Sequence, residues 1–226
     1  MRAAVAFVLA SIVCLLLALL LSLVARGGRP LPGDLAIAGW LQSWGGAPLD
    51  ALAAALSALG RTLPMTLIAL ACAAWLAGTE RRAAAVVVVA AATLRALSLP
   101  LKSAVARPRP TPDLVMVLER ASGAGFPSGH TLGATLLCVV LAGVLPLSGR
   151  FGWAARALLL ALPWVMGWAR VRVGAHWPSD VLAGLLWGGG AALALLAVLR
   201  MAAPAESTAL DAAASAQSAG ESPQSG

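Results

Sequence analysis

Three short segments hold most of the side chains in this chain that could do acid–base or anion chemistry. They are KSAVARPRP (residues 102–110), FPSGH (126–130) and ARVRVGAHWPSD (169–180). The only two histidines among the 226 residues, His130 and His176, both lie in these segments. Long apolar runs separate the segments, and a histidine beside a membrane-spanning run costs free energy and needs a reason. The three segments are therefore the first place to look for a functional site.

Cations dominate these segments, which carry Lys102, Arg107, Arg109, Arg170 and Arg172. Two histidines and an aspartate could ligate zinc, but so many neighbouring cations would repel a divalent ion. Arginine forks match the oxygens of a phosphate in bidentate geometry, and lysine adds a point charge. We therefore expect no metal and no other cofactor, and a phosphate group as the ligand.

The PSGH segment leads directly into an apolar run that we expect to be helical. Ser128 can cap this helix, and the N–H groups of its first turn then form an anion site. Gly129 lets the backbone approach a ligand closely. A motif this short is explained equally well by simple helix capping, so its meaning depends on the other two segments.

His176 and Asp180 are four residues apart, with a plausible helix start at Pro178 between them. The Asp180 carboxylate can then reach back to one ring nitrogen of His176 and leave the other free as a nucleophile or base. Capping by Asp180 is the alternative, but the second histidine and the cations favour catalysis. Two histidines at one phosphate suggest that one attacks phosphorus and the other protonates the leaving oxygen.

The elements that must position these residues are apolar, since 60% of the chain is hydrophobic and only 11% is charged. Runs of about 17–25 apolar residues are long enough to span a bilayer. Six such runs cover residues 4–25, 62–78, 83–101, 131–147, 152–169 and 181–199. We therefore expect an all-α fold, a six-helix transmembrane bundle.

The segment between the first two runs predicts two short interfacial helices, too short to span a bilayer. Asp34 and Asp50 are expected as their N-caps, and Gly60 as the stop of the second. Residues 1–202 are expected to form one membrane domain. Residues 203–226 are small and polar and are expected to be a disordered tail.

Six spans put both termini on one side of the membrane and the three polar segments on the other. When the cations of those segments are discounted, the positive-inside rule places the termini and the tail in the cytoplasm. The net charge of +7 does not predict nucleic-acid binding, because the basic residues lie at the ends of apolar runs. The three cysteines lie within apolar runs and predict neither a disulfide nor a zinc site.

The three segments also resemble, in order, the three signatures of the type 2 phosphatidic acid phosphatase family. The matching patterns are Lys102-x6-Arg109-Pro110, Pro127-Ser-Gly-His130 and Arg170-x5-His176-x3-Asp180. The resemblance covers roughly residues 34–199 and implies a six-helix membrane phosphatase that hydrolyses lipid phosphates without a metal. It assigns phosphate binding to Lys102, Arg109, Ser128, Gly129 and Arg170.

The resemblance also implies that His176 is the nucleophile, Asp180 its partner and His130 the general acid. One departure is Ala169, where the family usually has serine, so one hydroxyl near the site is missing. Arg107 and Arg172 lie outside the signatures and are expected to form salt bridges or to contact headgroups. Arg95 is expected to snorkel or to pair with another helix.

The expected protein is a multi-pass enzyme of the plasma (inner) membrane whose site faces the periplasm or exterior. Its substrate would be a lipid phosphate or diphosphate, because the site lies at headgroup level. The reaction would pass through a phosphohistidine. Three alternatives stay open. They are a phosphatase of the same fold acting on a soluble phosphate ester, an anion transporter, and a non-catalytic lipid binder. A transporter should carry its ionisable groups near the midplane, and retention of both histidines and Asp180 speaks against a mere binder.

Overall fold

The computed structural model describes residues 2–220, with side chains as far as residue 202, and every element among them is helical. The expected all-α class is therefore confirmed for this part of the chain. The elements are α1 (Arg2–Ala25), α2 (Asp34–Ser43), α3 (Ala47–Leu59), α4 (Thr62–Gly78), α5 (Arg82–Leu94), the 3-10 turn η1 (Arg95–Leu97), α6 (Ser98–Val105), α7 (Gly129–Val144), α8 (Gly149–Arg172) and α9 (Pro178–Gly220).

Four helical stretches are long and apolar enough to cross a membrane. They are Arg2–Ala25, Arg82–Val105, Gly149–Arg172 and Pro178–Ala202. The helices α3 and α4 meet at a bend of 60° and qualify as a fifth span only when they are taken together. The expected count of six is not confirmed, because α4 has 17 residues and α7 only 16, and about 20 are needed to cross the hydrocarbon core.

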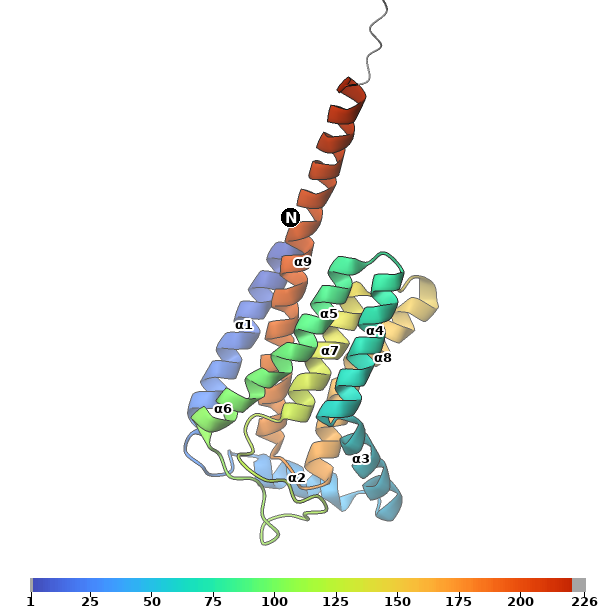
Figure 1. The fold of residues 1–226 in the computed structure, drawn as a ribbon. Helices are drawn as coiled ribbons and strands as arrows, with labels where there is room; N and C mark the ends of the chain where they lie inside the picture. The colour runs from blue at the N-terminus through green and yellow to red at the C-terminus, as the bar shows by residue number, and fades with distance from the viewer. Residues whose placement is uncertain (1, 221–226) are drawn as a thin grey trace, which may run out of the picture.

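The helix α7 lies in the middle of the bundle, between α5, α8 and α9 (Figure 1). Two glycines of α9 let these helices approach closely. A Cβ atom at Gly184 would come within 2.8 Å of the Ser128 carbonyl oxygen, and one at Gly188 within 2.6 Å of the Leu132 carbonyl oxygen. Small residues allow helix backbones to pack at this distance in membrane proteins. The packing places the start of α7 directly against the start of α9.

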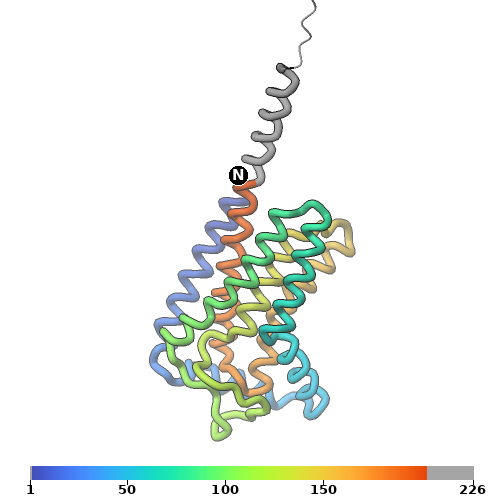
Figure 2. Tube along the Cα trace, viewed as in Figure 1, coloured from blue at the N-terminus to red at the C-terminus, as the bar shows by residue number. Residues whose placement is uncertain are grey.

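The polar segments gather at one end of the bundle. The long loop between α6 and α7 lies there together with α2 and the turn between α8 and α9 (Figure 2). The amide N–H groups of Leu118 and Glu119 both donate to the carbonyl of Val173, at 2.9 and 3.1 Å. The amide of Ser128 donates to the carbonyl of Asp180 at 2.9 Å. These bonds bring residues that are 50 or more positions apart to one face, as expected.

Two short helices do precede α4, but their expected N-caps are wrong. The N-cap of α2 is Gly33 and that of α3 is Gly46, and neither helix has a side-chain cap. Asp34 and Asp50 instead pair with arginines from other segments, described below. Gly60 does occupy the C-cap position of α3, as predicted.

The division at residue 202 and the disordered tail stay predictions, and residues 221–226 of that tail lie outside the described part of the chain.

Candidate active site

A cavity of about 530 Å³ opens at the polar end of the bundle and brings the three segments together. Its lining includes Lys102, Arg109, Gly129, His130, Arg170 and His176, which are six of the eight predicted site residues. The other two, Ser128 and Asp180, are completely buried. The sequence prediction that these residues share one site is consistent with this geometry.

His176 lies in the turn between α8 and α9 with its two ring nitrogens in different surroundings. Nδ1 is 3.5 Å from Asp180 Oδ2, while Nε2 is 3.1 Å from Nη1 of Arg109. An arginine can only donate, so Nε2 carries the lone pair and Nδ1 carries the proton, facing the carboxylate. This tautomer directs the Nε2 lone pair toward the cations of the cavity, where it accepts from Arg109.

The surroundings of His176 also keep its ring neutral. Burial, together with the positive charges of Arg109, Arg170 and Lys102, holds the pKa of the His176 imidazole well below its usual value. The contact with Asp180 is therefore one between a neutral ring and a carboxylate, not an ion pair. A neutral ring with an unprotonated nitrogen facing the cavity has the form that a nucleophile requires.

Asp180 is held by a buried network that the sequence analysis did not identify. Arg107, which is completely buried, donates from Nη1 to Asp180 Oδ1 and from Nη2 to Asp34 Oδ2, both at 2.7 Å. Asp34 also accepts from the amide and the hydroxyl of Ser179, at 2.9 and 2.7 Å. Oδ2 of Asp180 accepts the N–H of Trp177 at 3.0 Å. Arg107 thus forms a salt bridge, as expected, and fixes the Asp180 carboxylate, which lies 3.5 Å from His176 Nδ1.

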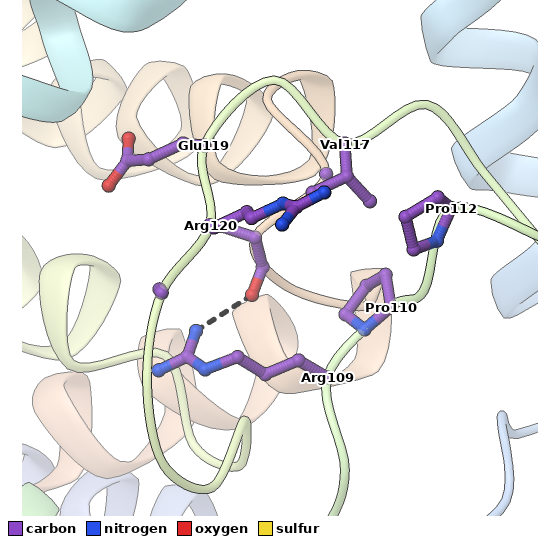
Figure 3. A pocket seen from close by; sticks show the side chains of 9 residues that line it. Arg109, Pro110, Pro112, Val117, Glu119 and Arg120 are labelled. Carbon is purple, nitrogen blue, oxygen red and sulfur yellow. Dashed lines mark hydrogen bonds between the residues drawn. The ribbon is translucent and has the colours of Figure 1, made fainter.

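Lys102 and Arg109 are oriented by carbonyl groups of the loop before α7. Lys102 Nζ donates to the Ala124 carbonyl at 2.8 Å, and Arg109 Nε donates to that of Gly123 at 3.0 Å. Arg109 Nη1 also donates to the Ala175 carbonyl at 2.8 Å (Figure 3). The loop therefore holds two positive charges beside His176 without neutralising either.

A second hollow, of about 430 Å³, also has Arg109 in its lining (Figure 3). The loop residues Pro110, Pro112 and Val117 form much of its wall. Neither histidine lines it, so the chemistry belongs to the first cavity.

Arg170 already has an acidic partner in the cavity. Its Nη1 lies 2.9 Å from Glu119 Oε2 and also donates to the hydroxyl of Ser57, which itself donates to Glu119. Burial raises the pKa of the Glu119 carboxyl, but the Ser57 hydrogen bond and the Arg170 charge outweigh it and lower the pKa below its ordinary value. Ser57 of α3 therefore supplies a hydroxyl to Arg170, the residue that follows Ala169.

The PSGH segment forms the start of α7 as expected, with one difference. Ser128 occupies the N-cap position, but its hydroxyl accepts a hydrogen bond from Thr131 at 3.0 Å and does not cap the helix. A Cβ atom at Gly129 would stand 4.0 Å from Cε of Lys102, so the helix start lies beside that cation. Nε2 of His130 is buried and has no hydrogen-bond partner among the described residues.

The contacts of Asp34, Ser57 and Glu119 with the site are not predictable from local sequence, because each residue bonds to a partner far away in the chain. Asp34 carries the only signal, as a lone charge at the start of an apolar stretch, and that position favours a helix cap. Ser57 and Glu119 carry no pattern that separates them from ordinary polar residues.

An all-helical fold with apolar helices long enough to cross a bilayer and a cavity lined by cations at one end defines the class of the chain, a helical membrane protein. A family model of the PAP2 superfamily matches residues 82–203, more than half of the chain. The chain therefore belongs to the PAP2 superfamily, and the resemblance noted in its sequence is confirmed.

Two solved structures have the same fold. The first is the PAP2-type phosphatidylglycerolphosphate phosphatase of Bacillus subtilis, with a TM-score of 0.67 and 22% identity over 82% of this chain and 93% of that one. The second is Aquifex aeolicus LpxE, with a TM-score of 0.59 and 23% identity over 72% of this chain and 94% of that one. A comparison with curated proteins gave no match. The chain thus has the fold of a membrane PAP2-type phosphatase.

Proposed function

We propose that this protein is an integral membrane phosphatase that hydrolyses a lipid phosphate or diphosphate through a phosphohistidine at His176. The observation that carries the proposal is the state of His176. Its Nε2 lone pair faces a cavity lined by Lys102, Arg109 and Arg170, and its Nδ1 proton faces Asp180.

The reaction proceeds in two displacements at phosphorus. Nε2 of His176 attacks in line, the bond to the lipid oxygen breaks, and His130 donates a proton to that oxygen as it leaves. A water molecule then attacks the phosphohistidine, gives its proton to His130 and releases inorganic phosphate. The cations hold the equatorial oxygens and offset the charge that spreads over them in the transition state.

The reaction as proposed needs no metal ion. The positive charges of Lys102, Arg109 and Arg170 occupy the place where a divalent cation would otherwise neutralise phosphate. Within residues 2–202, no group of three His, Cys, Asp or Glu side chains is arranged to hold a metal. The charge stabilisation that many phosphoryl-transfer enzymes obtain from Mg²⁺ is supplied here by side chains.

The shape of the cavity favours a lipid as the leaving group. Part of the lining comes from helices that carry no signature histidine, namely Thr62 and Thr66 of α4, Thr93 of α5 and Leu99 of α6. Leu99 and Thr93 are exposed on the outside of the bundle. A phosphate at Arg109 would therefore direct its ester oxygen toward a rim that faces lipid.

The proposal includes six membrane spans, with α4 and α7 as the two short ones, in the plasma (inner) membrane. The termini lie in the cytoplasm and the cavity faces the periplasm or exterior. Substrates of this description include phosphatidate, phosphatidylglycerol phosphate, undecaprenyl diphosphate and lipid A phosphates.

The test is phosphate release from these lipids by the purified protein in detergent, with EDTA present and with glycerol phosphate as the soluble control. We expect release from at least one lipid, resistance to EDTA, and a much lower rate on the soluble ester. Complete loss in EDTA that Mg²⁺ or Zn²⁺ restores would refute the metal-free mechanism. Equal rates on the soluble ester would refute the lipid specificity.

A further inference from the structure

Arg95 lies at η1, the break between α5 and α6, and its side chain turns into the protein. Nη2 donates to the Gly60 carbonyl at 2.8 Å and Nη1 to the Arg61 carbonyl at 3.2 Å. These two carbonyls belong to the corner where α3 ends and α4 begins. Arg95 therefore pairs with another segment, one of the two roles expected from the sequence. It bonds the corner between α3 and α4 to η1.

Gly60 at that corner leaves space that a larger residue would fill with its side chain. Its backbone, with φ of −73° and ψ of −5°, is one that any residue adopts. A Cβ atom there would stand 2.7 Å from Cδ2 of His130 and 2.7 Å from Sδ of Met166. The corner is therefore the wall against which the imidazole of His130 packs.

A second glycine makes room for Arg95 itself. Gly133 lies three residues after His130 on α7, so it is on the same face of the helix. A Cβ atom at Gly133 would stand 2.8 Å from Cδ and 3.0 Å from Nε of Arg95. The Arg95 side chain thus passes along α7 close to His130. Its guanidinium then donates to the carbonyls of the corner against which the His130 ring packs.

We propose that Arg95 and Gly60 are positioning residues that hold His130 at the leaving-group oxygen. The inference rests on the proposed function, in which His130 protonates that oxygen. A general acid must come within about 2.6–3.2 Å of its target. His130 Nε2 has no hydrogen-bond partner in the described part of the chain, so packing against the corner must fix the ring. Arg95 itself lines the cavity together with His130, and Gly60 lies directly against the His130 ring.

The test compares Gly60→Ala and Arg95→Met, each alone and combined with His130→Ala, on a lipid phosphate and on p-nitrophenyl phosphate. Misplacing a catalytic group by about 1 Å costs up to ~100-fold. We expect kcat on the lipid to fall by about 10- to 100-fold, with a much smaller loss on the aryl ester, which hardly needs a proton. In the His130→Ala background neither change should cost anything further, and Arg95→Lys should recover part of the loss.

Two matched variants control for general damage to the fold. Gly78→Ala changes a glycine of α4 that has open space around it. Arg156→Met removes an arginine that donates to the Ala142 carbonyl at 3.1 Å, away from the cavity. Both should keep the wild-type ratio of the two rates.

The possible failures are distinguishable. Equal losses on both substrates, or losses that multiply with that of His130→Ala, would show that Arg95 and Gly60 only support the fold and would overturn the inference. A wild-type protein that releases no phosphate from any substrate would refute the proposed function instead. If Gly60→Ala does not fold, Arg95→Met and Arg95→Lys still decide the question.

Discussion

Glu119 is the residue whose role is hardest to guess from sequence and easiest to test. Its carboxylate is paired with the guanidinium of Arg170, with Oε2 at 2.9 Å from Nη1. The family signature assigns that same guanidinium to phosphate binding. It either fills the place of a phosphate oxygen and yields to the substrate, or holds Arg170 in position for it. The two roles predict opposite changes in the affinity for a phosphate analogue when Glu119 loses its charge.

We expect Glu119 to be the occupant, so Glu119→Gln should tighten inhibition by vanadate, which mimics phosphate in the transition state. Removing the competing charge should be worth about 1 kcal/mol, or about fivefold in the inhibition constant. The control is Glu80→Gln, which alters an exposed pair with Arg82. Weaker inhibition in Glu119→Gln would show that this carboxylate supports Arg170.

The ionisation of His176 gives a second prediction at this scale. Burial and the neighbouring cations lower its pKa, so the ring should stay neutral well below pH 6.5, the usual midpoint of an imidazole. The folded protein then binds fewer protons than the unfolded chain below about pH 6.5, so this group lowers stability as the pH falls.

The measurement is an NMR titration of the imidazole nitrogens in tag-free His130→Ala protein. Only His176 remains in that variant, since the chain has two histidines. Nitrogen shifts that stay those of a neutral ring down to pH 5.5 would agree with the structure. A midpoint near pH 6.5 would contradict it.

Much of the site at residue scale was predictable from spacing. The distances between Lys102 and Arg109 and between His176 and Asp180 in the chain are short, so local geometry limits where their side chains can go. Glu119 and Ser57 meet Arg170 across 51 and 113 positions. Contacts that distant depend on how the helices pack, which one sequence does not reveal.

At the scale of elements, buried ion pairs link the short helices to the site. Arg107 joins α2 to α9 through Asp34 and Asp180. Arg172 joins α8 to α3 through Asp50, at 2.7 Å. Both arginines are nearly completely buried. Each salt bridge therefore joins a short helix to a long one through directional bonds, which apolar contacts do not provide.

We therefore expect Arg107→Met to destabilise the protein by about 3–5 kcal/mol, because it leaves two buried carboxylates without their partner. Activity should fall with it, since Asp180 loses its support. The measurement is thermal unfolding in detergent, with Arg82→Met as the control, because Arg82 and its partner Glu80 are 80% exposed. An unchanged melting temperature for Arg107→Met would contradict the buried network.

The elements also show where pattern reading fails. Asp34 and Asp50 stand at helix starts, where aspartate is usually a cap, yet arginines some 70 and 120 positions away bind both carboxylates. The apolar runs predicted the helices themselves, because each run is long and mostly hydrophobic. The number of helices that cross the membrane does not follow from the apolar runs in the same way. The helices α4 and α7 are close to the minimum length for a span.

At the scale of the whole molecule, the account requires the cavity and the termini to lie on opposite sides of the membrane. A cysteine at Ser122, on the loop beside Arg109, should react with a membrane-impermeant maleimide in intact cells. A reporter enzyme fused after Gly226 should behave as cytoplasmic. A tail reporter that behaves as external and a protected Ser122→Cys would place the site on the cytoplasmic face.

The central claim is that phosphate passes through His176, and rapid quenching with a ³²P-labelled lipid phosphate tests it most directly. The account predicts a protein-bound label that acid releases and base does not, present in wild type and absent from His176→Ala. His130→Ala should still carry the label when the leaving group is p-nitrophenol. A label of the same kind and amount on His176→Ala, or turnover by that variant at the wild-type rate, would contradict the account.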